Sequence, residues 1–244
     1  DEFGVKSGKN QYRSKMEWRC HEEDIFCVFS RMPPQLHALV LDNGIEGLPS
    51  HFRSNVRIHY QFAATGPAFR LDLTGVDTFI APNGTDHIAL YRNRDVIRDF
   101  LDRGGRLLCF DGWFPEWIPG HRRIMDNYKR TIHTRYQIRD HVGPIADRFQ
   151  VEDLNFSNGI SGWWAGGYIE AHPKAKVLME DTWQRPLVVI DTESTPGTII
   201  LTASGPLGDG SYATTDDSGT NRAMVDLYHA LIDYISLPQP ATAL

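Results

Sequence analysis

The most informative part of the sequence is Phe100-Leu-Asp-Arg-Gly-Gly-Arg-Leu-Leu-Cys-Phe-Asp-Gly112. Apolar residues at helical spacing lead into it from residue 91 and stop at Gly104-Gly105, a pair that typically ends a helix. The apolar run that follows, residues 106–110, predicts a buried strand. Asp111-Gly112 then predicts a sharp turn. The stretch therefore indicates a helix over 91–103, a strand and a tight turn.

The same alternation continues on both sides of this stretch. We predict earlier strands at residues 38–41, 56–62 and 76–80, later strands at 175–179, 186–190 and 198–202, and a closing helix at 221–235. Helices that connect parallel strands predict an α/β fold, a three-layer sandwich with a mainly parallel sheet. Residues 113–170 are rich in glycine and hold four of the six tryptophans, which predicts long loops over the sheet.

Composition excludes several classes of protein. The 244 residues are 41% hydrophobic and carry a net charge of −6 without a basic cluster, so we expect no nucleic-acid partner. The apolar runs are far shorter than the roughly 20 residues that span a bilayer, so we expect a soluble protein without a membrane partner. Three cysteines are too few for a disulfide scaffold or a repeated zinc pattern.

Two regions differ in character. Residues 1–34 are polar and lack a clear period, which predicts an N-terminal extension, and the α/β domain is expected over 35–244. The extension contains Cys20 and Cys27, and the sequence leaves open whether they pair. The chain starts at Asp1 without a signal-peptide pattern. We favour a cytoplasmic location, and a secreted or periplasmic one stays open.

Four segments, in this order, resemble class I glutamine amidotransferase-like domains and their trehalose-utilisation (ThuA-like) branch. They are residues 75–86, residues 100–112, Arg139-Asp-His-Val-Gly-Pro-Ile-Ala-Asp-Arg-Phe149, and the late strand pair 186–190 and 197–202. Together they extend over about residues 36–236. The resemblance implies a flavodoxin-like arrangement of the sheet.

The sequence departs from this family at its catalytic centre. The family's nucleophilic cysteine would fall on Asp111, and Cys109 lies two residues earlier, inside the predicted strand. Where a His-x-Glu pair should follow the last strand, residues 203–210 contain neither residue type. Because thiolate attack on glutamine needs a cysteine activated by histidine, we expect no glutaminase activity.

The resemblance suggests a site at the carboxyl ends of the strands. The candidate catalytic residues are Asp111 and His87. We expect the Asp111 carboxylate to bind a metal, orient water or accept a hydrogen bond from a substrate hydroxyl, and His87 to act as a general base. In the family, the glycine that corresponds to Gly84 donates a backbone N–H to an oxyanion, and the resemblance implies the same role for Gly84. The expected substrate-binding residues are Asn83, Gly84, Gly112, Trp113, Trp163 and Trp164. Flat aromatic rings beside acids are typical of sugar sites.

Each of these residues also has a simpler interpretation. Asp111-Gly112 is equally explained as a turn pair, His87 as a surface or capping histidine, and the tryptophans as aromatics packed over the edge of the sheet. His141 and Glu152, with neighbouring Asp153, suit a divalent metal such as zinc, manganese or iron, and solvated loop residues are the alternative. We therefore name no certain cofactor, and a divalent metal stays open.

Two functional hypotheses follow. The first is a ThuA-like protein that binds or processes a carbohydrate or a related small polar metabolite. If it is an enzyme, the chemistry is hydrolytic or metal-assisted. The second is a catalytically inert member of the fold that serves as a binding or assembly module, for example within a homo-oligomer. Fold analogy alone does not choose between them.

Overall fold

The computed structural model describes residues 35–110, 113–125, 129, 133–155, 165–205 and 219–237, with only the backbone of 219–221. The contacts divide the chain into two units, Asp1–Pro34 and Gln35–Leu244. The second unit contains all the elements described below. The predicted N-terminal extension, with Cys20 and Cys27, lies outside the described residues.

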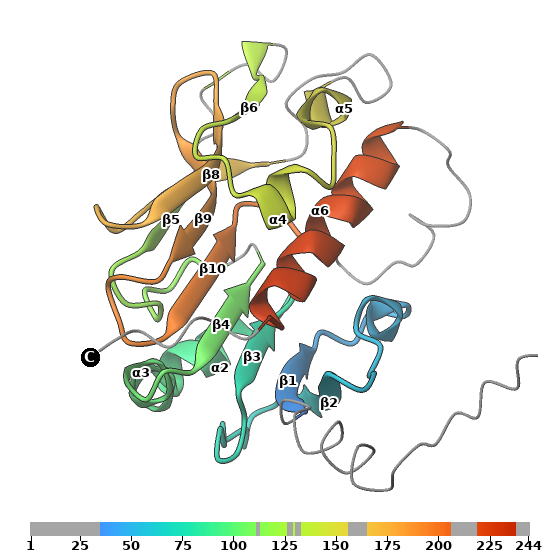
Figure 1. Ribbon diagram of the computed structural model, residues 1–244. Coiled ribbons are helices and arrows are strands. Elements are labelled where there is room, and N and C mark those ends of the chain that lie inside the picture. Colours follow the sequence, from blue (N-terminus) through green and yellow to red (C-terminus); the bar gives the residue numbers. More distant parts are fainter. Residues whose placement is uncertain are drawn as a thin grey trace, which may run out of the picture. The chain divides into compact units, whose positions relative to one another are not determined.

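An eight-stranded sheet forms the centre of this unit, in the order β2-β1-β3-β4-β10-β9-β8-β6 (Figure 1). The strands are β1 (Leu36–Asp42), β2 (Ile58–Ala64), β3 (Thr78–Ala81), β4 (Arg106–Cys109), β6 (Tyr136–Ile138), β8 (Lys176–Asp181), β9 (Pro186–Asp191) and β10 (Thr198–Thr202). The five strands from β2 to β10 are parallel, whereas β9, β8 and β6 join by antiparallel pairing. The sheet is therefore mixed, with a parallel majority. A separate antiparallel pair joins β5 (Arg122–Met125) to β7 (Gly167–Glu170).

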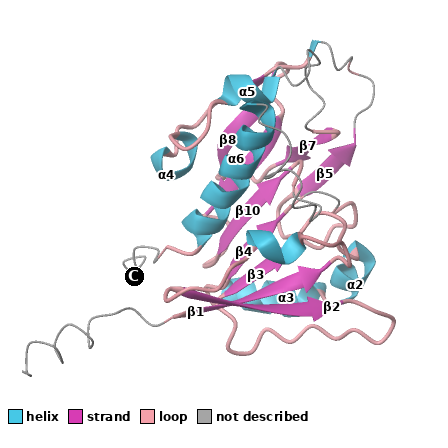
Figure 2. Ribbon diagram, turned by 90° about the vertical axis from the view of Figure 1, so that its right-hand side faces the viewer, coloured by secondary structure: helices cyan, strands magenta, loops and turns pink. Residues whose placement is uncertain are grey.

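Helices cover both faces of the parallel strands. In Figure 2, α6 and α4 lie on one side of these strands and α2 on the other. The helical elements are the 3₁₀ helix η1 (Leu48–His51), α2 (His87–Arg92), α3 (Arg94–Asp102), α4 (Gly143–Ala146), α5 (Val151–Asn155) and α6 (Gly219–Ile235). The sequence-based prediction of an α/β fold is thus confirmed. None of the described helices is both long and apolar enough to cross a membrane.

The core explains why the central strands could be predicted. All residues of β3 and β10 are buried, as are three of the four residues of β4. Strands covered on both faces bury every side chain and therefore appear as continuous apolar runs. On α6, Ala223, Leu227 and Leu231 are buried as the helical period predicts.

The predicted helix over 91–103 is wrong in one respect, because the chain forms two helices that meet at Asn93. The Asn93 side chain donates to the carbonyl of Ala89 (2.8 Å) and accepts from the backbone N–H of Leu71 (3.1 Å). Asparagine side chains that bond to nearby backbone groups compete with a continuing helix. This contact makes the buried Asn93 a junction between α2, α3 and the loop before β3.

The prediction of long loops over residues 113–170 also needs correction. This region contains β5, β6, β7, α4 and α5, and it buries Trp113, Trp117 and Tyr136. Strands of three or four residues are too short for their apolar periodicity to stand out in the sequence.

Candidate functional site

The strands β1, β3, β4 and β10 are parallel, so their carboxyl ends, at Asp42, Ala81, Cys109 and Thr202, lie along one edge of the sheet. The chain passes from β1 to β2 on one side and then returns to β3 on the other side of β1. Open α/β sheets bind ligands outside the carboxyl ends of their strands, where the strand order reverses in this way. The carboxyl ends of β1 and β3 are therefore the candidate site.

A hydrogen bond joins the two loops at this position. The side-chain Nδ2 of Asn43, just after β1, donates to the backbone carbonyl of Asn83, just after β3 (2.8 Å), and its Oδ1 accepts from Ile45 N (3.0 Å). We call this contact the Asn43–Asn83 bridge. It fixes the relative position of two loops that are 40 residues apart in the sequence.

The predicted site residues Asn83 and Gly84 lie in a tight turn between β3 and α2. The Thr85 hydroxyl donates to the carbonyl of Pro82 (2.6 Å), and Gly84 has a φ of +81°, a conformation that favours glycine. Asp86 accepts from Ile88 N (3.1 Å) and Ala89 N (3.0 Å), so its carboxylate caps α2.

His87 is buried, with 8% of its surface exposed, at the start of α2. Its ring stacks on the indole of Trp117, with 6.0 Å between ring centroids and 24° between their planes. His87 is therefore not a surface histidine. The stack ties α2 to the segment that follows β4.

Trp113 and Trp117 are both almost fully buried, at 0% and 2% exposure. Trp113 therefore has no exposed ring face on which a sugar could stack, and this packing agrees with the simpler interpretation of aromatics that cover the sheet. Neither indole N–H meets an acceptor within the part of the chain that the structure describes. An unsatisfied buried donor costs about 1–3 kcal/mol, which an acceptor from water or a ligand would offset.

Arg123 adds a buried cation near the same edge, and no pattern in the sequence indicates it. Its guanidinium donates to the carbonyls of Ile124 (2.6 Å), Tyr168 (3.3 Å) and Ala203 (3.3 Å), and the residue is 4% exposed. Ala203 directly follows β10. A Cβ on Gly167 would lie 2.2 Å from Arg123 Nη1, so a glycine makes room for this side chain.

The remaining predicted residues of this edge lie outside the described part: Asp111, Gly112, Trp163 and Trp164. Residues on both sides of the predicted turn are described. Cys109 is the last residue of β4 and is fully buried, in agreement with a thiol that faces packed neighbours. A Cβ on Gly205 would lie 2.3 Å from Cβ of Phe110, so the chain after β10 packs directly against the end of β4.

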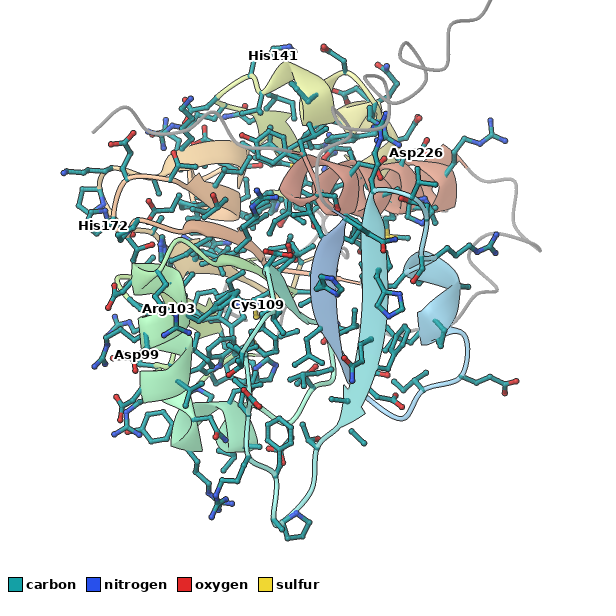
Figure 3. All side chains as sticks on the ribbon, turned by 60° about the horizontal axis from the view of Figure 1, so that its bottom comes forward. Asp99, Arg103, Cys109, His141, His172 and Asp226 are labelled. Atoms are coloured by element: carbon teal, nitrogen blue, oxygen red, sulfur yellow. The ribbon has the colours of Figure 1, made fainter. Side chains whose placement is uncertain are left out.

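The proposed metal ligands belong to the segment between β6 and α4 and to α5. His141 is exposed, and its Nε2 lies 3.1 Å from Asp147 Oδ1. Figure 3 shows His141 at the periphery while Cys109 lies in the interior. Glu152, exposed on α5, accepts from Asn155 Nδ2 (3.4 Å). Among the described residues, no three His, Cys, Asp or Glu side chains lie together as a metal site requires.

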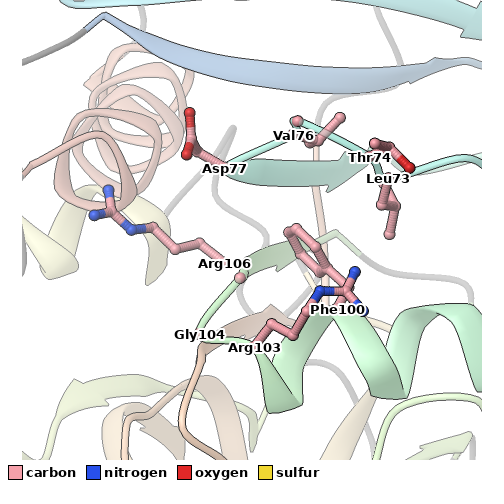
Figure 4. A pocket seen from close by; sticks show the side chains of 10 residues that line it. Leu73, Thr74, Val76, Asp77, Phe100, Arg103, Gly104 and Arg106 are labelled. Atoms are coloured by element: carbon pink, nitrogen blue, oxygen red, sulfur yellow. The ribbon is translucent and has the colours of Figure 1, made fainter.

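One cavity opens at the opposite, amino-terminal edge of the sheet, and another lies beside the β5–β7 pair. The first, of about 460 Å³, lies between the loops that precede β3 and β4, and Figure 4 shows the side chains of Arg103 and Asp77 among those that line it. On the far side of this cavity, Arg106 donates to the carbonyls of Ile235 and Leu237 (2.9 Å each) at the end of α6. Parallel sheets bind ligands at the other edge, so this cavity is not the first candidate.

The second cavity, of about 550 Å³, is partly lined by His121, which belongs to a buried polar cluster. His121 Nε2 donates to Asp191 Oδ2 (2.9 Å), and both side chains are fully buried. Asp191 also accepts from the Ser194 hydroxyl and from the backbone N–H groups of Glu193 and Ser194. Burial alone would raise the pKa of Asp191, but these hydrogen bonds outweigh it and hold the pKa well below its ordinary value.

This cluster is not a catalytic triad. Serine and histidine both bond to the same carboxylate, so the imidazole does not contact the hydroxyl that it would have to activate. His121 Nδ1 accepts from the backbone N–H of His172 (3.3 Å), which leaves the proton of a neutral ring on Nε2. The cluster therefore joins β9 to the β5–β7 pair.

Comparison with known proteins gives a fold and no family. No family model matches the chain, and no curated protein matches it. The solved structures similar to it include Cytoplasmic Protein STM1381 from Salmonella typhimurium LT2 (TM-score 0.52, 13% identity, 80% of this chain and 98% of that one) and Cytoplasmic Protein STM3548 from Salmonella typhimurium (TM-score 0.51, 10% identity, 82% of this chain and 97% of that one). At this identity the likeness concerns the fold alone. The chain thus shares an α/β fold with two proteins that are described as cytoplasmic.

Proposed function

We propose that this protein is a ThuA-like member of the amidotransferase-like fold that binds a carbohydrate or a related small polar metabolite at the carboxyl edge of its parallel strands. The observation that carries the proposal is the Asn43–Asn83 bridge. It holds two polar loops together where the strand order reverses, which is where doubly wound sheets bind small ligands.

The strand order supports the fold part of this proposal. The parallel strands follow the order β2-β1-β3-β4-β10, which is that of flavodoxin-like sheets. The segments that resemble the amidotransferase-like family coincide with β3, with the unit α3–β4, with α4, and with β9 and β10.

The chemistry of the edge supports a ligand rich in hydrogen-bond acceptors. The guanidinium of Arg123 contributes positive charge there. The indole N–H groups of Trp113 and Trp117 are buried and lack an acceptor among the described residues, so a sugar oxygen would accept from them through a bridging water and not by direct contact. Asp111, which follows β4 in the sequence and lies outside the described residues, remains the proposed carboxylate. Glutaminase chemistry is not part of the proposal, because Cys109 is buried inside the strand.

A thermal-shift assay with a panel of neutral sugars, sugar acids and sugar phosphates tests this function. A ligand present at a hundredfold its Kd stabilises by about 2.7 kcal/mol, which raises the Tm by about 5–10 °C for a domain of this size. Asn43→Ala and Asp111→Ala should each reduce the shift.

The matched control is Asp99→Ala, which removes an exposed carboxylate from α3. It should keep the full shift. If no compound in the panel raises the Tm of the unsubstituted protein, the carbohydrate proposal fails. That result would favour the alternative, an inert binding or assembly module. If a sugar acts equally on all variants, the ligand binds elsewhere.

A further inference from the structure

Two histidines face each other between η1 and α6. His51 is the last residue of η1, and His229 lies midway along α6. Their ring centroids are 5.7 Å apart and the ring planes are inclined by 66°. Both residues are half-buried. Within the described residues, the buried Nε2 of His51 has no hydrogen-bond partner. The pair therefore joins two elements that are far apart in the sequence.

Four charged side chains influence the pKa of His229 electrostatically. Asp226 and Asp233 belong to α6, Arg53 follows η1, and Arg148 follows α4. Of the four, Asp233 has the largest effect on His229. Arg148 forms an ion pair with Asp233 (2.5 Å) and so partly neutralises it. The effects of two acids and two arginines on His229 thus oppose one another, and at His51 the neighbouring His229 adds to the effect of burial.

The surroundings disfavour the charged form of both rings. Burial lowers the pKa of His51, and the neighbouring His229 lowers it further. Burial also lowers the pKa of His229, an effect that Asp233 and Asp226 oppose and that Arg148 and Arg53 reinforce. Both pKa values therefore lie below the ordinary histidine value of 6.5.

We propose that the contact between His51 and His229 is an acid-sensitive latch, in which neutral imidazoles hold η1 against α6 and their protonation opens that contact. Protonation would place two positive charges 5.7 Å apart. It would also put an N–H on His51 Nε2, the atom that has no partner among the described residues. Leu48 and Phe52, on either side of the contact, are buried and oppose opening. The open form is therefore a minor population, and pH sets its size.

The latch lies on the connection between β1 and β2, which begins with Asn43. Opening η1 frees the chain that follows the Asn43–Asn83 bridge, so acid should also weaken binding at the carboxyl edge. This link to binding rests on the proposed function. The latch itself does not, because it can be measured without any ligand.

The sign and size of the pH effect follow from linkage. The open form has ordinary histidine pKa values and the closed form lower ones, so opening takes up protons as the pH falls below about 6.5. The closing contact is fully present above that pH. Below it, the opening equilibrium constant rises by up to about tenfold per pH unit for each histidine, until the pKa of the closed form is reached.

Hydrogen exchange at the amides of Ser50 and Phe52 measures the opening directly. These amides donate to the carbonyls of Gly47 (2.9 Å) and Pro49 (3.2 Å) inside η1. After correction for the intrinsic pH dependence of exchange, we expect their opening to increase from pH 7.5 to pH 5.5, by at most about tenfold for each histidine. The amide of Leu107, in the fully buried part of β4, should not change.

Variants separate the latch from general acid effects. The double substitution His51→Gln and His229→Gln should remove the pH dependence of these two amides. The control His59→Gln changes an exposed histidine on the neighbouring strand β2 and should leave it intact. The same pH dependence in the double variant would overturn the proposal.

A second measurement covers the case in which the double variant does not fold. NMR titration of the imidazole signals in the unsubstituted protein should show both histidines titrating below pH 6.5. Titration of either ring at or above that value would also overturn the latch. Neither outcome depends on sugar binding, so this proposal and the proposed function can fail separately.

Discussion

Replacement of Asp191 by asparagine tests whether the buried His121–Asp191–Ser194 cluster holds the second half of the molecule together. In the native protein, Oδ2 accepts from His121 Nε2 (2.9 Å) and from the Ser194 hydroxyl, and Oδ1 accepts from two backbone N–H groups (2.9 Å each). Asparagine keeps the shape and one oxygen. Its NH₂ group replaces the other oxygen and faces two donors.

The expected loss can be worked out from these contacts. The oxygen Oδ1 still accepts its two backbone bonds, so the main loss is of two charge-assisted hydrogen bonds at about 1.5–3 kcal/mol each. Counted instead as two buried donors left without an acceptor, the loss is about 1–3 kcal/mol for each donor. We therefore expect Asp191→Asn to lower the free energy of unfolding by about 3–5 kcal/mol.

Urea unfolding followed by tryptophan fluorescence and circular dichroism provides the assay. With a slope of about 2–3 kcal/mol/M, the midpoint should fall by about 1–2 M while the slope stays unchanged. Asp99→Asn, on the exposed face of α3, is the control and should stay within about 0.5 kcal/mol. A loss below about 1 kcal/mol for Asp191→Asn would refute the view that the cluster stabilises the fold.

The same residue predicts how acid acts on this cluster. The pKa of Asp191 in the folded protein lies below its ordinary value of 3.8. Its stabilisation is therefore fully present above pH 3.8 and is lost as the pH falls through the lower, folded value. This window lies well below the one expected for the histidine latch, so a pH series resolves the two effects.

Three further predictions concern packing and exposure. Gly105→Ala should destabilise by about 1–3 kcal/mol in urea unfolding, because the added Cβ would lie 2.5 Å from the ring of buried Phe100, whereas Gly66→Ala, with open space around it, should be close to neutral. Cys109 should resist alkylation in the native protein and react in urea, as peptide mass mapping would show; rapid native labelling would contradict its burial. Glu170→Gln should cost no more than about 1 kcal/mol, since its 2.6 Å ion pair with Arg122 is about half exposed on both sides.

The central strands could be predicted because burial on both faces leaves a direct trace in the sequence. Residues 38–41, 106–110 and 198–202 are continuous apolar runs between turn formers, and β1, β4 and β10 occupy them. The break between α2 and α3 could not be predicted, because it depends on the bond from Leu71 to Asn93, 22 residues away. Local periodicity does not contain such a contact.

The candidate site likewise contains some residues that the sequence indicates and others that it does not. Asn83 and Gly84 lie in the turn after a strand, as the resemblance indicates. Asn43 and Arg123 gave no signal, since an isolated asparagine or arginine has many uses and only the sheet brings their partners close. His121 and Asp191 are 70 residues apart, and no spacing rule connects them.

Asp77 and Arg106 have a consequence for how the chain can be rearranged. The Asp77 carboxylate accepts from the backbone N–H of His37 (2.8 Å), and its carbonyl accepts from the N–H of Arg106 (3.1 Å). Arg106 in turn bonds the carbonyls of Ile235 and Leu237. The first strand and the last helix of the domain therefore start and end at neighbouring points. A short linker between them, with new ends at an exposed turn, should give a circular permutant that keeps every contact of the sheet.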